Sequence, residues 1–218
     1  MLDTSMPKWH IHAMTASTLR ERQAEQVRAA VLDAVVAQLE ARTVDDIAMA
    51  DVAAAAGISL RTLYRYFPDR AALLHATGDH LYRTLGIGPE IARPADISAS
   101  FRDSAARLSA RPALTRALIQ TTAGRAARSA ARGQRVDAIR EALAPLTDGL
   151  DPDTARRATA VIAHLCSAAS WVAVSDDSGL DDDDAQQAVA WAIDTLIEAL
   201  ASPRRAPTLR LGRRTKNS

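Results

Sequence analysis

The stretch TVDDIAMADVAAAAGISLRTLYRYFPDRAALL, residues 43–74, decides the fold, because it predicts two short helices joined by a tight turn and the start of a third. Thr43 and Asp46 have the S/T-x-x-D/E spacing that caps a helix start. Gly57 breaks the first helix where a left-handed backbone is needed, and Ser59 suits the N-cap of the second. A short helix presented by such a turn can enter the major groove of DNA.

The second helix of this stretch is expected to run from Ser59 to about Tyr66, where Phe67-Pro68 ends it. Leu63 is expected to face the core, and the remaining side chains are too polar to be buried together. They could form an ordinary solvated helix face, but in this turn-linked context they predict DNA contacts to bases and phosphates. The candidates are Ser59, Arg61, Thr62, Tyr64, Arg65 and Tyr66.

These residues carry a family resemblance. The string IAMADVAAAAGISLRTLYRYFPDRAALL resembles the N-terminal domain of the TetR family of bacterial repressors, over about residues 26–85. Family members commonly carry A-G-V-S-x-x-T-L-Y-x-Y-F-x-x-K-x-x-L. Arg70 replaces the usual lysine here, Arg61 stands where small residues are frequent, and Met49 where a small or acidic residue is usual. The resemblance implies an all-helical dimer with a C-terminal effector domain, and phosphate contacts from Thr43 and Arg70.

Composition is consistent with a helical protein of one or two domains. The chain has 218 residues, 48% of them hydrophobic but only 4% aromatic, so the core is expected to consist of Ala, Leu, Val and Ile. Ala-rich, Gly-poor stretches favour helix, and about nine helices are expected. No uninterrupted apolar run of about 18 residues and no apolar signal region are present. A single cysteine, Cys166, excludes an internal disulfide and suits a bacterial cytoplasm.

The chain divides into four expected parts. Residues 1–17 lack periodicity and are expected to be a flexible arm, and 18–85 to form the helix-turn-helix domain with its connecting helix. Residues 86–202 are expected to form an effector-binding and dimerisation domain. Residues 203–218 are a basic tail of charge +6, so the rest of this chain of net charge +1 carries −5. Such a tail is either a solvated end or a source of non-specific phosphate contacts.

Two further sets of residues are candidates in the C-terminal part. Each could instead belong to the core. The first set consists of candidates for an effector pocket, taken from the helices expected to surround it. They are His80, Phe101, Leu118, Thr121, Thr122, His164 and Trp171. Small and apolar residues of the last two expected helices, 152–174 and 183–201, predict a dimer seam. They are Ala163, Ser167, Ser170, Val174, Ala188, Trp191, Ala192, Thr195 and Leu196. Sparse aromatics favour a medium-sized apolar effector.

The expected function is a dimeric regulator that binds a palindromic operator and is most simply a repressor released by a small molecule. A transcriptional activator, and a helical interaction protein that does not bind DNA specifically, are the alternatives. An enzyme is not expected, because the sequence has no paired carboxylates in apolar surroundings, no Cys–His arrangement and no Gly-rich phosphate loop. No cofactor, metal or membrane partner is expected; the two histidines of WHIH, residues 9–12, lack further ligands.

Overall fold

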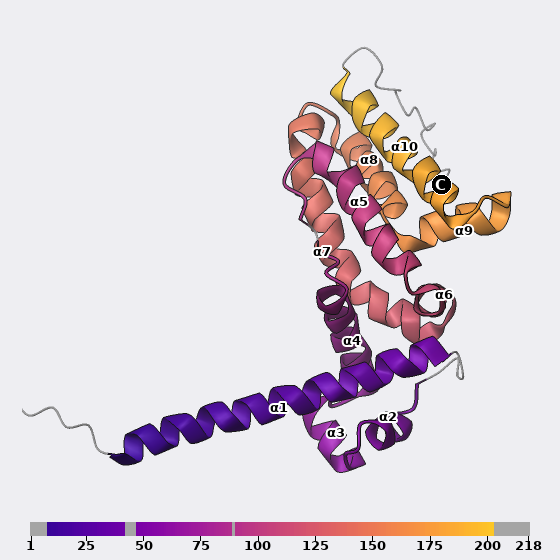
Figure 1. The fold of residues 1–218 in the computed structure, drawn as a ribbon. Helices are drawn as coiled ribbons and strands as arrows, with labels where there is room; N and C mark the ends of the chain where they lie inside the picture. Colours follow the sequence, from indigo (N-terminus) through magenta and orange to yellow (C-terminus); the bar gives the residue numbers. More distant parts are fainter. Residues whose placement is uncertain (1–7, 42–46, 89, 203–218) are drawn as a thin grey trace, which may run out of the picture.

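The computed structural model is all-helical, as the composition predicts (Figure 1). It describes residues 8–41, 47–88 and 90–202, without the side chains of residues 8–18, 130 and 131. The described residues form ten α-helices and no strand. The helices are α1 (Lys8–Ala41), α2 (Met49–Ala55), α3 (Leu60–Tyr66), α4 (Arg70–Thr84), α5 (Pro94–Ser109), α6 (Pro112–Gln120), α7 (Thr122–Thr147), α8 (Pro152–Leu165), α9 (Ala168–Ser178) and α10 (Asp182–Ala201).

The N-terminal part is built on the long helix α1, with α2 and α3 below it and α4 leading away toward the second domain (Figure 1). Val31, Val35 and Leu39 recur every four residues and are buried, so one apolar stripe of α1 faces the core. α1 begins at Lys8, ten residues before the expected start at Thr18, and part of the expected arm is therefore helical. Residues 1–7 and the basic tail, 203–218, lie outside the described residues.

The start of α2 differs from the prediction. α2 begins at Met49, and the extended backbone of Ala48 (φ −87°, ψ 134°) makes that residue the N-cap. The predicted start at Thr43 is therefore too early for this helix, and Thr43 itself lies outside the described residues. The later caps follow the sequence signals. Ser59 accepts a hydrogen bond from the backbone N–H of Thr62, and Asp69 from that of Ala72.

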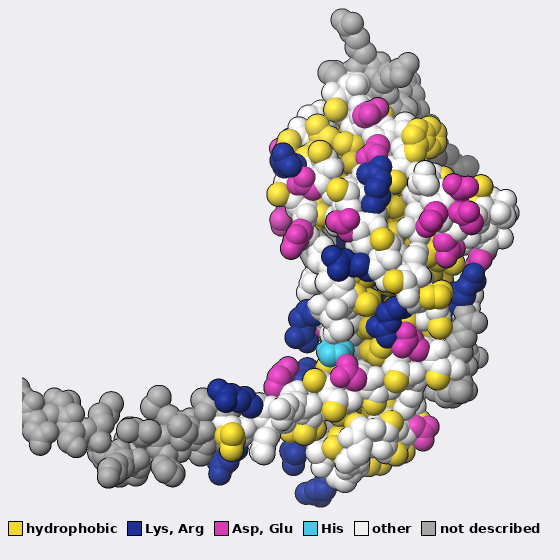
Figure 2. All heavy atoms as spheres, in the orientation of Figure 1, with side chains coloured by type: hydrophobic (Ala, Val, Ile, Leu, Met, Phe, Trp, Pro, Cys, Tyr) yellow, Lys and Arg dark blue, Asp and Glu magenta, His cyan; other side chains and the backbone are white. Residues whose placement is uncertain are grey.

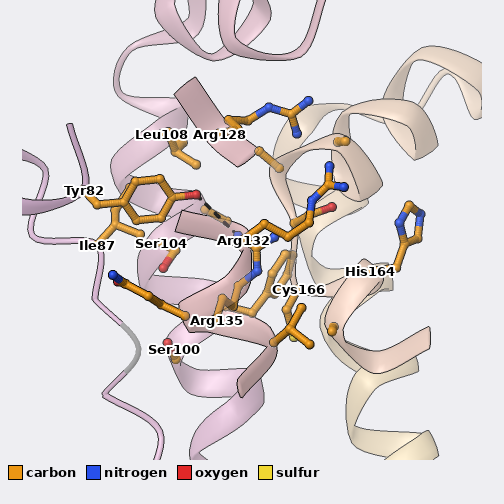
Figure 3. A pocket seen from close by; sticks show the side chains of 18 of the residues that line it. Tyr82, Ile87, Ser100, Ser104, Leu108, Arg128, Arg132, Arg135, His164 and Cys166 are labelled. Atoms are coloured by element: carbon orange, nitrogen blue, oxygen red, sulfur yellow. Dashed lines mark hydrogen bonds between the residues drawn. The ribbon is translucent and has the colours of Figure 1, made fainter. Parts of the chain in front are cut away.

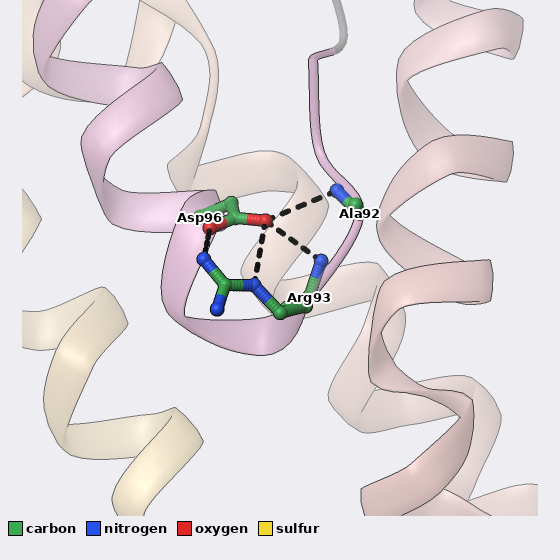
Figure 4. A network of polar contacts seen from close by, with 3 residues as sticks. All are labelled: Ala92, Arg93 and Asp96. Carbon is green, nitrogen blue, oxygen red and sulfur yellow. Dashed lines mark hydrogen bonds and ion pairs between the residues drawn. The ribbon is translucent and has the colours of Figure 1, made fainter.

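α5 begins at Pro94 and has a network of hydrogen bonds at its N-terminus (Figure 4). The Asp96 carboxylate accepts from the backbone N–H groups of Arg93, at 2.9 Å, and Ala92, at 3.3 Å. It also pairs with the Arg93 guanidinium at 2.9 Å. The hydrogen bond from the Arg93 side chain is the main reason that the pKa of Asp96 lies below its ordinary value. This cap fixes the connection between α4 and α5.

The C-terminal domain packs α5, α7, α8 and α10 side by side, with α9 across one end (Figure 1). All five helices contribute buried side chains to its core, which is the second core of the protein. The first core is the cluster around Val31 and Leu63 of the N-terminal helices. The members of the second core are Ile97, Phe101, Ala105, Ile139, Ala142, Leu143, Ile162, Ala163, Trp171, Val172, Val189, Ala190 and Ile193. This second core is mostly aliphatic, with two aromatic side chains.

The single helix expected over 152–174 is two helices, α8 and α9, bent by 68°. α8 ends at Leu165, and Ser167 has an extended backbone (φ −115°, ψ 149°) that starts α9. The sequence contains no glycine or proline at this point, so the break has no local signal. Trp171 and Val172, just after the bend, are buried in the second core, and tertiary packing therefore overrides local helix propensity.

The core of the N-terminal helices continues into the C-terminal domain. The same cluster of buried side chains that contains Val31 and Leu63 also contains Leu114 and Leu118 of α6 and Ala123 of α7. Gly124 lies where α6 and α7 meet, and a Cβ there would overlap backbone atoms of Ala117 and Leu118. The N-terminal helices, α6 and the start of α7 are thus packed as one apolar unit.

Candidate functional site

The turn between α2 and α3 has the geometry that the glycine predicts. Gly57 has φ +66°, in the left-handed region that favours glycine. The backbone N–H of Ile58 donates to Ala53 O at 3.0 Å, which closes the end of α2. Val52 of α2 and Leu63 of α3 are completely buried and fix the angle between the two helices. α2 and α3 form a helix-turn-helix.

The face of α3 opposite Leu63 is exposed and polar. Arg61, Tyr64 and Arg65 are exposed, and the Tyr64 side chain is 47% accessible. Figure 2 shows basic side chains at the end of the molecule where Figure 1 places α2 and α3. Three of the predicted DNA contacts therefore project together from one short helix.

The other predicted DNA contacts are already engaged within the chain. Ser59 Oγ lies 2.8 Å from Thr62 Oγ1 and caps α3, and Thr62 is half-buried. Tyr66 packs against the first core, with the Arg65 guanidinium 5.2 Å from its ring centroid. Arg70 donates from Nε to Ile47 O at 3.0 Å and so ties the start of α4 to the segment before α2. These four residues stabilise the platform that presents Arg61 and Tyr64.

A cavity of about 440 Å³ lies in the C-terminal domain, between the end of α4 and helices α5, α7, α8 and α9 (Figure 3). Four of the predicted ligand residues line it: Phe101, Leu118, His164 and Trp171. Ile97 and Leu108 add further apolar surface, and Ser100 and Ser104 add hydroxyl groups. The cavity therefore combines an apolar wall with a polar side.

Three predicted ligand residues do not line the cavity. His80 Nε2 lies 2.7 Å from Asp33 Oδ1, so His80 joins α4 to α1 instead. Thr121 is the N-cap of α7 and accepts from the backbone N–H of Gly124 at 2.9 Å. Thr122 is exposed and lies beside Arg125, whose Nη2 donates to its hydroxyl at 3.3 Å. These three residues lie outside the lining of this cavity, because each occupies a helix contact or a helix start.

Sequence reasoning missed the polar side of the cavity, which is basic. Arg128, Arg132 and Arg135 of α7 line it together with Tyr82 of α4. Arg135 Nη1 donates to the Tyr82 hydroxyl at 3.3 Å, and Arg128 Nε donates to Leu118 O at 2.7 Å (Figure 3). Burial lowers the pKa of Arg128, and the neighbouring arginines lower it further. The signal was the i, i+4, i+7 spacing, which puts the three on one helix face.

Cys166 also lines the cavity, at the bend between α8 and α9. Burial raises the pKa of its thiol to about 12, although the positive charge of Arg135 opposes that shift. The thiol is therefore protonated at neutral pH and is a poor nucleophile. This agrees with a structural role for the single cysteine.

The segment that forms the helix-turn-helix decides the identity. A model of the family described as "Bacterial regulatory proteins, tetR family" matches residues 31–77, from the middle of α1 to the middle of α4. Residues 31–77 therefore match the N-terminal segment of the TetR family. The all-helical structure, with an N-terminal helix-turn-helix and a C-terminal helical domain, fits this family.

One curated relative of this chain is the "HTH-type transcriptional repressor LfrR" of Mycolicibacterium smegmatis, 35% identical over 81 residues. That match covers 37% of this chain and 42% of LfrR, so the chain matches less than half the length of this relative. Two similar solved structures are TetR regulators from Rhodococcus sp. RHA1 and Streptomyces coelicolor. The Rhodococcus structure has a TM-score of 0.49 at 21% identity, and the match covers 81% of this chain and 97% of that structure. The Streptomyces structure has a TM-score of 0.48 at 18% identity, and the match covers 81% of this chain and 82% of that structure.

The C-terminal domain exposes apolar side chains on α8 and α10. Trp191 is 69% exposed and Val161 is 50% exposed, on two helices that pack together. Ala163, Ser167 and Ser170, predicted for a dimer seam, are mostly buried within the single chain. The remaining seam candidates are exposed or half-buried, and these are Val174, Ala188, Trp191, Ala192, Thr195 and Leu196.

The described residues contain neither a cluster of metal ligands nor a single helix that could span a membrane. No three His, Cys, Asp or Glu side chains there are grouped so that they could hold a metal ion. No single helix there is long and apolar enough to cross a membrane. Only α8 and α9 taken together, across their 68° bend, reach the required length and composition, and their buried residues belong to the second core.

Proposed function

We propose that the protein is a dimeric transcriptional repressor that binds a palindromic operator through α3 and leaves it when a small molecule occupies the cavity. The observation that carries this proposal is the exposed polar face of α3 on a helix-turn-helix within the segment that the family model matches. The name of LfrR, a transcriptional repressor, supports repression rather than activation. Such a protein acts where the DNA is, in the bacterial cytoplasm.

The contacts of α3 divide by chemistry. An arginine can hold guanine through two hydrogen bonds in the major groove, so Arg61 is proposed to read a base. The Tyr64 hydroxyl and Arg65 are proposed to bind phosphates, which fix the position of the helix along the duplex. Thr62 is half-buried beside the Ser59 hydroxyl, so it is proposed to contact the DNA only where the duplex comes very close to α3. Specificity then depends mainly on one exposed guanidinium in each subunit.

Two copies are needed to read a palindrome. The exposed Trp191 and Val161 support a dimer formed by α8 and α10, because an exposed tryptophan beside further apolar surface favours association. Two recognition helices related by a two-fold axis would bind half-sites about 34–36 Å apart, or a multiple of that distance. Binding therefore depends on how far apart the dimer holds its two α3 helices.

The cavity is coupled to the DNA-binding helices through shared side chains. Leu81 of α4 and Leu118 of α6 line the cavity and also belong to the buried cluster that contains Leu63 of α3. A ligand that displaced either side chain would repack the core beneath the helix-turn-helix. Tenfold relief of DNA binding requires about 1.4 kcal/mol of differential affinity between the two states.

Selection of bound duplexes from a random pool by the purified protein tests this proposal. We expect an enriched inverted repeat, bound less tightly as salt rises. The selected sequence is then placed across a reporter promoter in a bacterial host with and without the protein. Lower expression with the protein identifies a repressor, higher expression an activator, and the absence of any enriched sequence contradicts specific DNA binding.

A further inference from the structure

We infer that the cavity binds an organic anion with an apolar body, whose negatively charged head group lies against Arg128, Arg132 and Arg135. This inference rests on the proposed role of the cavity as the effector site. It replaces the purely apolar effector that the scarcity of aromatic residues suggests, and it follows from the charges and unpaired donors of the wall.

The first argument is the charge of the wall. Three arginines project from one face of α7 into the same cavity, and none of the described residues that line it is Asp or Glu. On α7 itself, the nearest acid is Asp137, which pairs with Arg140 at 2.7 Å on the exposed side. Three like charges around one partly enclosed space repel one another. An anion in that space removes the repulsion, whereas a cation would increase it.

The second argument is the supply of hydrogen-bond donors. Arg135 Nε and Trp171 Nε1 are buried and have no acceptor among the described residues, and both side chains line the cavity. Each of these atoms can only donate. A buried donor without a partner costs free energy, and a carboxylate or phosphate oxygen supplies the missing acceptor. Charge and donors therefore select the same ligand chemistry.

The third argument concerns the rest of the ligand. The wall across from α7 is apolar, with Ile97, Phe101 and Leu108 of α5. About 440 Å³ is enough for a medium-sized molecule. The head group therefore needs an apolar body to fill the cavity, and a small inorganic ion would leave most of it empty. Carboxylate and phosphate heads share this chemistry.

Calorimetric titration of the full chain with decanoate, 1-decanol and decylamine tests the inference, because the three probes differ only in the head group. Decanoate is expected to bind at least tenfold more tightly than decanol, and decylamine more weakly still. Decyl phosphate, titrated in parallel, distinguishes a phosphate from a carboxylate head. Decanol or decylamine binding as tightly as decanoate, or no binding by either anion, overturns the inference.

Substitutions locate the head group. Arg135→Gln and Arg132→Gln are each expected to weaken the binding of decanoate at least threefold and to leave the affinity for decanol unchanged. Arg132 is exposed, so its replacement keeps the test valid if Arg135→Gln fails to fold. Arg140→Gln, on the exposed side of the same helix, is the matched control and is expected to change neither probe. Unchanged decanoate affinity in both cavity variants contradicts the inference.

DNA binding is measured on the same preparations, so the two proposals fail separately. Sequence-specific DNA binding without any preference for the anion would contradict the anion site and leave the proposed regulator function standing. Decanoate selectivity in a protein that enriches no DNA sequence removes the regulator and leaves the anion site. Release of the selected duplex by decanoate, but not by decanol, is the result expected if both hold.

Discussion

Arg111, the N-cap residue of α6, donates two hydrogen bonds to Glu40 in the last turn of α1: Nε to Oε1 at 2.8 Å and Nη2 to Oε2 at 2.7 Å. Both side chains are partly buried, and this two-bond geometry is the strongest that an arginine and a carboxylate make. The pair joins the longest helix of the DNA-binding half to the C-terminal domain. It therefore belongs to the same interface as the shared apolar core.

A double-mutant cycle with Arg111→Gln and Glu40→Gln is expected to give a coupling free energy of about 1 kcal/mol or more. Urea unfolding of the four proteins measures it. The control cycle uses Arg102 and Asp194, an exposed pair joined at 2.8 Å, for which about 0.2–1 kcal/mol is expected because solvent screens it. Equal coupling free energies in the two cycles would show that the Arg111–Glu40 pair stabilises the fold no more than an exposed ion pair does.

Arg61→Ala is expected to change which base is preferred at one position of each half-site, with about 1–3 kcal/mol lost there. The reason is that Arg61 is exposed on α3 and can reach a guanine edge. Fluorescence anisotropy on a panel of single-base operator variants measures the change, with Arg140→Ala on α7 as the control. A uniform loss across the whole panel would instead assign Arg61 to a phosphate.

Trp191→Asp is expected to weaken the dimer, because it places an unpaired charge in a packed apolar seam. Trp191 is 69% exposed in the single chain, so the substitution should leave the fold of the subunit intact. Analytical ultracentrifugation at micromolar concentration should show a dimer for the wild type and more monomer for the variant. A monomeric wild type that still binds a palindrome tightly would refute the α8–α10 dimer.

Two glycines of α7 are expected to respond oppositely to alanine. Gly124→Ala should destabilise the fold by about 1–3 kcal/mol, because the new methyl group would overlap the backbone of α6. Gly133→Ala, in the same helix with open space around it, should stabilise the fold by up to about 1 kcal/mol. Urea unfolding decides, and equal effects at the two positions would mean that α6 does not lie close to Gly124.

The helix-turn-helix could be predicted because its signals are local. Gly57, Ser59 and Phe67-Pro68 each specify a turn, a cap or a stop within a few residues, and the structure uses Gly57 and Ser59 as predicted. The break at Ser167 could not be predicted in this way, because no glycine or proline marks it and Trp171, just after it, is buried against distant helices. Local signals identify elements, whereas packing determines where long apolar helices bend.

The cavity was predicted in part for the same reason. Phe101, Leu118, His164 and Trp171 were identified by residue type and helix. The arginines of α7 were missed because a basic stripe on a helix usually faces solvent, and only the position of α4 and α8 around α7 encloses this one. The contact of His80 with Asp33 could not be predicted, because the two residues are 47 positions apart in sequence. Long-range partners of polar side chains are the least predictable part of the site.

The most direct test of the central claim, that α3 is the DNA-reading helix, is photo-crosslinking from the α3 face. Tyr64→p-benzoylphenylalanine places a photoreactive ring at an exposed position of α3, and Arg140→p-benzoylphenylalanine places the same ring on the exposed side of α7. With the selected duplex bound, irradiation is expected to join protein and DNA through position 64 and not through position 140. Binding that persists without a crosslink at position 64, or with equal crosslinks at both positions, would contradict the account.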